Sequence, residues 1–200
     1  MRIILASRNS HKVREILQIL STDSIQVLGL DAFPELPEVP EDQDSFEGNA
    51  LQKARFVYER TGLLSVADDS GLEVDALNGA PGVRSKRFTP EATSQANNKK
   101  LLEVLGTEPK RTARFRCAIA VVGPTGEATA TGSCEGHIAH EERGSGGFGY
   151  DPLFMPSTFP GHTMAEVSAE DKNRISHRGE AFRKLPALLR EIGLNIKSDH

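Results

Sequence analysis

Short apolar runs alternate with amphipathic stretches along the first hundred residues. Residues 2–6 form an apolar run that stops at the polar turn residues 7–10, and hydrophobic side chains then recur at helical spacing. The pattern predicts a strand followed by a helix. In that helix the inward positions are Val13, Ile16, Leu17 and Leu20, and the positions expected to face solvent are Lys12, Arg14 and Glu15.

The same periodicities predict the remaining elements. Apolar or alternating runs predict strands over 2–6, 25–30, 63–67, 114–121 and 127–140. Helical spacing predicts helices that begin near residues 10, 46, 94 and 169, and a last amphipathic helix over 181–192 that Pro186 kinks or restarts. Residues 123–126 are typical of a hairpin turn. We therefore expect an α/β fold in which helices flank a mixed, twisted sheet.

Two segments between these elements are rich in carboxylates. Residues 31–47 hold seven carboxylates, no Lys or Arg, and prolines at 34, 37 and 40, a composition that predicts a long acidic loop. The strand over 63–67 is expected to end at Asp68-Asp69-Ser70-Gly71. Successive side chains on a strand point to opposite faces, so at most one of the two aspartates is expected to enter a cleft. A solvated turn is the alternative.

Composition narrows the class of protein. Two hundred residues fit one compact domain, 1–200, with two lobes and frayed residues 197–200. A net charge of -4 disfavours a nucleic-acid coat protein. We expect no membrane segment and no signal peptide, because no apolar run approaches the ~18 to 20 residues that span a bilayer. Cys117 and Cys134 are too few for a disulfide scaffold, so a cytoplasmic location is expected.

Two motifs are weaker than their spacing suggests. Residues 144–149 match G-x-G-x-x-G, but no apolar strand precedes them and no helix follows, so a dinucleotide site is not expected. Cys134, His137 and His140 are spaced three apart, which on a strand puts neighbouring members on opposite faces. We do not expect them to hold a metal ion, and the chain contains no Walker motif.

Three segments together favour a nucleotide phosphohydrolase. Ser7-x-Asn9-x-x-Lys12 joins polar side chains to the free N–H groups of a helix start, which suits phosphate. Asp68 and Asp69 offer carboxylates for Mg²⁺, and residues 172–178 form a dense cationic stretch. Ordinary helix capping and a solvated helix face are the alternatives for the first and the last segment.

Six motifs in order closely resemble the inosine triphosphate pyrophosphatase family, the Ham1-like pyrophosphatases of non-canonical purine nucleoside triphosphates. The motifs are Ser7-Arg8-Asn9-Ser10-His11-Lys12, Ser45-Phe46-Glu47-Gly48-Asn49-Ala50 with Lys53, Ala67 to Leu72, Gly79 to Val83, Gly146 to Pro152, and Lys172-Asn173-Arg174-Ile175-Ser176-His177-Arg178. The resemblance covers nearly the whole chain. It implies an ITPase-like fold whose two lobes flank a central active-site cleft, a homodimer, and Mg²⁺-dependent hydrolysis of ITP, dITP and XTP to the monophosphate and pyrophosphate.

The resemblance also implies roles for individual residues. Asp69 would be the catalytic base and, with Glu41, a ligand of Mg²⁺. The implied substrate contacts are Ser7, Arg8, Asn9, Ser10, His11, Lys12, Lys53, Ser70, Phe148, Gly149, Tyr150, Asp151, Lys172, His177 and Arg178. Two positions depart from the family pattern: Gly48 stands where Glu is usual, and Lys86 where a small residue is usual.

Two other functions remain open at this stage. A Maf-like pyrophosphatase acting on pyrimidine or modified nucleotides is the nearest enzymatic alternative. A nucleotide-binding regulator without catalysis is the alternative from another class, since motif and fold do not guarantee activity. The nucleoside triphosphate is a small-molecule partner, and neither nucleic acid nor a membrane is expected as a partner.

Overall fold

The computed structural model describes residues 1–20 and 25–194. In this part of the chain a six-stranded sheet has the order β2-β1-β3-β4-β5-β6. The strands are β1 Arg2–Leu5, β2 Gln26–Gly29, β3 Ser65–Val74, β4 Thr112–Gly123, β5 Gly126–Ile138 and β6 Phe154–Pro156. β1 pairs in parallel with both β2 and β3, whereas β5 and β6 are antiparallel. The sheet is therefore mixed, as the sequence predicts.

Six α-helices and three short 3₁₀ helices are found in the described residues. The α-helices are α1 Ser10–Ile19, α2 Phe46–Thr61, α3 Ser94–Leu105, α4 Ala169–Ile175, α5 His177–Arg183 and α6 Leu185–Glu191. The 3₁₀ helices are η1 Leu30–Ala32, η2 Asp75–Leu77 and η3 Gly82–Arg87. The break between α5 and α6 confirms the predicted restart at Pro186. No helix in the described part of the chain has the length and apolar character that crossing a membrane requires.

The described residues fall into two compact units. Unit 1 contains residues 1–69, 117–132 and the described part of 178–200, and unit 2 contains residues 70–116 and 133–177. β3, β4 and β5 contribute residues to both units. The predicted frayed residues 197–200 lie outside the described part.

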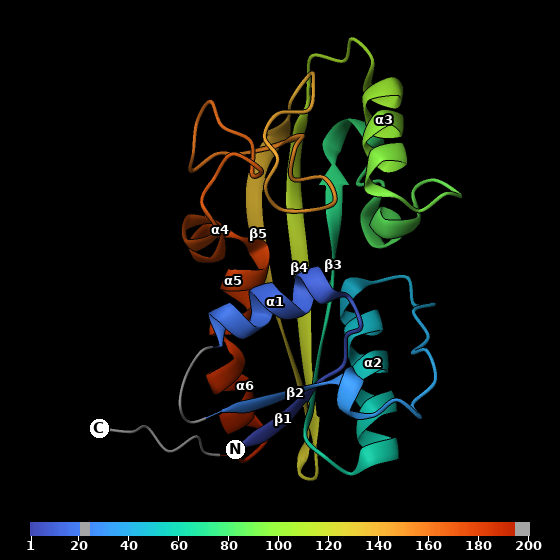
Figure 1. The fold of residues 1–200 in the computed structure, drawn as a ribbon, viewed down its shortest axis with the longest axis vertical. Coiled ribbons are helices and arrows are strands. Elements are labelled where there is room, and N and C mark those ends of the chain that lie inside the picture. Colours follow the sequence, from blue (N-terminus) through green and yellow to red (C-terminus); the bar gives the residue numbers. More distant parts are fainter. Residues whose placement is uncertain (21–24, 195–200) are drawn as a thin grey trace. The chain divides into compact units, whose positions relative to one another are not determined.

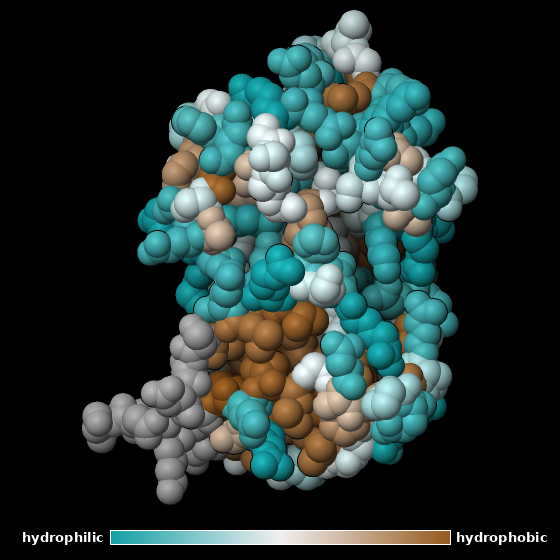
Figure 2. All heavy atoms as spheres, viewed as in Figure 1, coloured by the Kyte–Doolittle hydropathy of each residue, from teal (hydrophilic) through white to brown (hydrophobic). Residues whose placement is uncertain are grey.

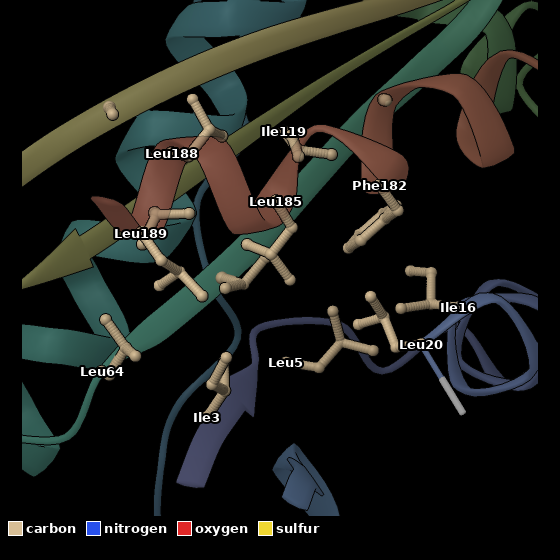
Figure 3. Close-up of a cluster of buried hydrophobic side chains, with 14 of the residues drawn as sticks. Ile3, Leu5, Ile16, Leu20, Leu64, Ile119, Phe182, Leu185, Leu188 and Leu189 are labelled. Atoms are coloured by element: carbon tan, nitrogen blue, oxygen red, sulfur yellow. The ribbon is translucent and has the colours of Figure 1, made fainter. Parts of the chain in front are cut away.

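Unit 1 has its core between the sheet and three helices. Ile3 and Leu5 of β1 pack with Ile16 and Leu20 of α1 and with Phe182, Leu185 and Leu189 from α5 and α6 (Figure 3). Ile4 is also completely buried but lies outside this cluster, as expected for a strand covered on both faces. In Figure 1, α2 lies on the opposite side of β3 from α5 and α6.

Unit 2 has a second core. Leu72 and Val74 of β3 pack there with Leu101 and Leu105 of α3, and the cluster also contains Phe115, Cys134, Ile138, Tyr150, Leu153, Phe154 and Met164. Thr93 caps α3, because its side chain accepts a hydrogen bond from the N–H of Ala96, and Gly106 ends the helix. The predicted helix near 94–106 is confirmed.

Several predictions from the pattern are wrong in detail. β3 does not end at Asp68 but continues to Val74. Leu17 is 44% exposed, whereas Lys12 and Glu15, expected to face solvent, are partly buried. β4 shows its half-buried alternation only at its start and is buried without interruption from Cys117 to Gly123. β6 was not predicted, because three residues are too few to show a period.

The surface of unit 1 is not uniformly polar. Figure 2 shows hydrophobic side chains reaching the surface in its lower part. Met1 and Leu17 are each more than two-fifths exposed, and Val13, Ile19, Ile25 and Val27 are only partly buried against the core.

Candidate active site

Ionisable side chains from four elements and one loop meet in unit 1. This carboxylate–cation cluster consists of Lys12 and Glu15 on α1, Glu41 on the acidic loop, Lys53 on α2, Asp68 and Asp69 on β3, and Arg178 on α5. Three cations face four carboxylates. The cluster therefore joins segments that are far apart in the sequence, and it explains why β3 can carry two adjacent aspartates without ending.

Asp68 is the buried centre of the cluster. Its side chain is inaccessible to solvent, and its Oδ2 lies 2.9 Å from Nζ of Lys12 and 3.6 Å from Nε of Arg178. Arg178 also pairs with Glu15. Burial alone would raise the pKa of Asp68, but Lys12 and Arg178 lower it well below its ordinary value. The two cations thus hold Asp68 in its charged form at neutral pH.

Asp69 has a different environment one residue further along β3. Its Oδ1 lies 3.6 Å from Nζ of Lys53, and its Oδ2 accepts a hydrogen bond of 2.9 Å from Nδ2 of Asn49. The side chain keeps 10% of its surface exposed. Burial raises the pKa of Asp69 above its ordinary value, and Lys53 and Lys12 only partly oppose that shift. A carboxylate whose proton affinity is raised is suited to act as a base.

Lys53 bridges the two predicted metal ligands. Its Nζ donates to Oε1 of Glu41 at 2.7 Å and lies 3.6 Å from Oδ1 of Asp69. Burial would lower the pKa of Lys53, but Asp69, Asp68 and Glu41 together raise it, so the ammonium group stays charged. The structure thus brings Glu41 and Asp69, the two predicted metal ligands, to the same lysine, which is itself a predicted substrate contact.

The donor set suits a hard cation. No group of three or more His, Cys, Asp or Glu side chains in the described residues could by itself hold a metal ion. Glu41 and Asp69 offer carboxylate oxygens on either side of Lys53, and Mg²⁺ commonly uses one or two carboxylates together with substrate phosphates and water. Glu41 and Asp69 could therefore hold a magnesium ion whose remaining ligands are water or substrate phosphates, in place of their contacts with Lys53.

The start of α1 is a capped helix terminus. Oδ1 of Asn9 accepts hydrogen bonds from the N–H groups of His11 and Lys12. Oγ of Ser7 accepts a further one from the N–H of Asn9. Ser10 and His11 are exposed. The guanidinium group of Arg8 donates to the carbonyl oxygen of Leu36 at 2.8 Å and so holds part of the acidic loop.

The glycine-rich segment of unit 2 is organised around Asp151. Oδ2 of Asp151 lies 2.6 Å from Nζ of Lys172 and accepts a hydrogen bond of 2.7 Å from the N–H of Phe148. Nζ of Lys172 lies 4.9 Å from the centre of the Phe148 ring, within the range of a cation–π contact. Lys172 is 6% exposed, so the alternative of a solvated helix face does not hold at this residue.

Gly147 is required by this arrangement. Its φ of +71° lies in the left-handed region, and a Cβ atom added there would lie 2.1 Å from Oδ2 of Asp151. Any side chain at this position would therefore displace the carboxylate from Lys172 and from the N–H of Phe148. The glycines of the segment serve loop geometry rather than a dinucleotide fingerprint.

Three more predicted contacts lie around this segment in unit 2. The ring of His177 stacks on Phe115 with 4.8 Å between centroids and an interplanar angle of 16°. The hydroxyl of Tyr150 donates to the carbonyl oxygen of Ser85 at 2.8 Å. Gly149 accepts a hydrogen bond of 3.2 Å from Nδ2 of Asn98. His177 and Tyr150 are both buried, so their packing supports the glycine-rich segment in addition to any contact with a ligand.

The predicted residues thus form two groups. Unit 1 holds Ser7 to Lys12, Glu41, Lys53, Asp69 and Arg178, and unit 2 holds Ser70, Phe148 to Asp151, Lys172 and His177. Ser70 directly follows Asp69 on β3 and is partly exposed.

Sequence reasoning missed Asn49, Asn98 and Glu15 as members of these groups. Asn49 lies one turn before Lys53 on the buried face of α2, between Phe46 and Val57. A second polar residue, beside Lys53, among the apolar positions of one helix face is the signal that could have identified it.

Comparisons with known proteins point to one family. The model of the Ham1 family matches residues 3–188. A dITP/XTP pyrophosphatase of Desulforamulus reducens is 50% identical over 196 residues, which cover 96% of this chain and 97% of the relative. A dITP/XTP pyrophosphatase of Geobacter sulfurreducens is 51% identical over 185 residues, covering 90% and 92% of the two chains.

Solved structures show the same fold. The Ham1 protein of Staphylococcus aureus superposes with a TM-score of 0.84 at 37% identity, covering 96% of this chain and 99% of that one. A HAM1 protein of Coxiella burnetii gives the same TM-score at 40% identity and the same coverage. The family model, the similar sequences and the similar folds therefore agree, and this chain belongs to the Ham1 family.

Proposed function

We propose that this chain is a nucleoside triphosphate pyrophosphatase that hydrolyses dITP, XTP and ITP to the monophosphate and pyrophosphate. The arrangement of Glu41, Lys53 and Asp69 carries the proposal, because it combines carboxylate oxygens for a cation with a partly exposed base. The names of the relatives, dITP/XTP pyrophosphatases, support the same activity. Removal of non-canonical purine nucleotides from the cytoplasmic pool is the proposed role.

We propose Mg²⁺ as the cofactor, held by Glu41 and Asp69. When bound, Mg²⁺ neutralises phosphate charge and orients the triphosphate. Lys53 and Lys12 add positive charge for the phosphates, and the positive end of the α1 dipole points the same way although Asn9 already caps its N–H groups. Asp69 takes a proton from the attacking water, a task open to a carboxylate that keeps one tenth of its side chain exposed.

The proposed base contacts belong to unit 2. Phe148 offers an aromatic face, and Asp151, Lys172 and His177 surround the segment that carries it. A hydrogen-bond donor directed at the 6-oxo group would reject adenine, because two donors would then face each other without an acceptor. Arg178 is a proposed substrate contact as well, although its pairs with Asp68 and Glu15 give it a structural task too.

Product analysis tests the proposed reaction. The purified chain with Mg²⁺ is assayed with dITP, XTP, ITP, ATP, GTP and TTP, and ITP hydrolysis is repeated in ¹⁸O-labelled water. We expect turnover of the first three, release of pyrophosphate, and label in IMP only, because attack at the α phosphate expels pyrophosphate as one unit. Preference for TTP would favour a Maf-like activity, and no turnover would favour a regulator.

The position of the label shows which phosphorus is attacked. Labelled pyrophosphate would indicate attack at the β phosphate. Release of IDP with labelled orthophosphate would indicate attack at the γ phosphate.

A further inference from the structure

Asn49 lies at the point where the acidic loop meets the catalytic strand. The residue is only 3% exposed, on the buried face of α2. Burying an amide is costly unless its hydrogen bonds are made, and both ends of this amide are used. Nδ2 donates to Oδ2 of Asp69 at 2.9 Å, and Oδ1 accepts from the N–H of Gln43 at 2.9 Å.

The loop residue held by Asn49 lies two positions after Glu41. Glu41 contacts Lys53, one helical turn beyond Asn49 on α2. Asp42 is attached to the same helix, since Nε2 of Gln52 donates to its Oδ1 at 2.7 Å. The Glu41 segment therefore lies along α2. Of the α2 residues that hold it, only Asn49 and Lys53 also contact Asp69.

The two links to Asp69 differ in kind. Lys53 is a cation, so its contacts with Glu41 and Asp69 compete with any metal ion that those carboxylates bind. Asn49 is neutral, and it occupies one oxygen of Asp69 and a backbone N–H rather than the Glu41 carboxylate. Its contacts can persist while a metal ion binds. The carboxylates of the acidic loop repel the Asp69 carboxylate, and this repulsion would move the Glu41 segment away. The hydrogen bonds of Asn49 oppose that movement.

We propose that Asn49 is a positioning residue that fixes Glu41 and Asp69 relative to each other by holding the loop backbone and the Asp69 carboxylate with one amide. The inference rests on the proposed function, in which these carboxylates bind the metal ion. Groups that orient the ligands of a metal ion typically change its affinity by about 10- to 100-fold when they are removed. Asn49 therefore contributes to metal affinity without being a ligand.

The test measures Mn²⁺ binding to the nucleotide-free protein from the electron paramagnetic resonance signal of free Mn²⁺. We expect Asn49→Ala to weaken binding about tenfold or more. The matched control is Asn97→Ala in unit 2. Asn97 is also buried, and its amide likewise accepts from a backbone N–H, that of Thr89, and donates to the carbonyl oxygen of Ser85. We expect Asn97→Ala to lose about as much thermal stability as Asn49→Ala. Its Mn²⁺ affinity should stay within about twofold of the wild-type value, the range we take as unchanged. Unchanged affinity in folded Asn49→Ala would overturn the proposal.

A second pair of variants avoids the buried position. Gln43 is exposed, and its backbone N–H donates a hydrogen bond to Oδ1 of Asn49. Gln43→Pro removes this N–H group, whereas Gln43→Ala keeps it. We expect weaker Mn²⁺ binding only for Gln43→Pro, and equal affinities of the two variants would contradict the proposal. Absence of Mn²⁺ binding by the wild-type chain would also overturn it. Failure of the wild type to hydrolyse dITP, with the Mn²⁺ results as expected, would instead overturn the proposed function alone.

Discussion

Asp68 and Asp69 show how burial and partners separate two identical side chains. Asp68 is inaccessible and lies between Lys12 and Arg178, which lower its pKa. Asp69 keeps some exposure, and burial outweighs its attraction to Lys53, so its pKa is raised. The first residue stabilises the cluster and the second is available for chemistry.

Asp69→Asn should abolish most turnover while the protein stays folded. The amide keeps the shape of the side chain but can neither accept a proton from water nor supply a charged oxygen. Because burial disfavours the charged form, we expect the free energy of unfolding at pH 7 to be no lower than that of the wild type. Kinetics at saturating Mg²⁺ and urea unfolding measure the two effects. Near wild-type turnover would remove Asp69 from the mechanism.

Asp68→Asn should act through stability. It leaves the buried Arg178 and the partly buried Lys12 with less compensation, and breaking a buried pair costs about 3–5 kcal/mol. The lowered pKa means that the charged form stabilises the folded protein above the unfolded value of about 3.9, and that this stabilisation is lost as the pH falls below it. Urea unfolding should therefore show a constant deficit from pH 8 to pH 5. A deficit that disappears between pH 8 and pH 5 would contradict this assignment.

At the scale of elements, α2 serves as the platform for the acidic loop. Ser45 caps the helix, and its Oγ accepts a hydrogen bond from the N–H of Gly48. A Cβ atom at Gly48 would lie 2.9 Å from Cβ of Gln43 and 2.9 Å from Oγ of Ser45. The glycine that departs from the family pattern thus gives the loop room to lie against the helix.

Gly48→Ala should displace the loop with little loss of stability. Alanine is favoured over glycine within a helix by about 1 kcal/mol, which offsets part of the strain at Gln43. Displacement of the Glu41 segment should raise the Mg²⁺ concentration needed for half-maximal turnover. The control is Gly29→Ala, where the nearest atom to an added Cβ is 4.0 Å away. An unchanged Mg²⁺ requirement would show that the loop does not depend on this contact.

α4 and the glycine-rich segment form the other functional pair of elements, joined by Lys172 and Asp151. Lys172→Met should lower kcat/KM at least tenfold and destabilise the protein by about 3 kcal/mol, because Asp151 stays buried without its cation. The double variant Lys172→Met, Asp151→Asn should regain stability but not activity, if Lys172 also binds substrate. Arg174→Ala, at a side chain 68% exposed, is the control and should be nearly silent. Recovery of activity in the double variant would assign Lys172 a structural role only.

At the scale of the whole molecule, the family resemblance predicts a homodimer. The exposed apolar side chains of unit 1, among them Met1 and Leu17, are compatible with association. Light scattering should give twice the 21.7 kDa mass of one chain at micromolar concentration. A mass of one chain under these conditions would contradict the prediction.

The order and type of most elements followed from the sequence, because local periodicity and caps act over a few residues. Asn9, Thr93 and Ser168 mark helix starts as predicted, and the acidic segment has no long element before α2 begins at Phe46. The family resemblance also implied roles for Asp69, Glu41 and Lys53, and the structure places Lys53 in contact with both carboxylates.

Only the tertiary structure decided which polar residues are buried and which neighbours they have. Glu15 and Arg178 are 163 positions apart, and no local pattern distinguishes their ion pair from two solvated charges. Local pattern also failed for β3, where Asp68 suggests the end of the strand. Cations from α1 and α5 compensate the charge of Asp68, and the strand continues to Val74. Local sequence fixes backbone preferences, whereas the electrostatic energy of a buried charge depends on partners that only the fold brings within a few ångströms.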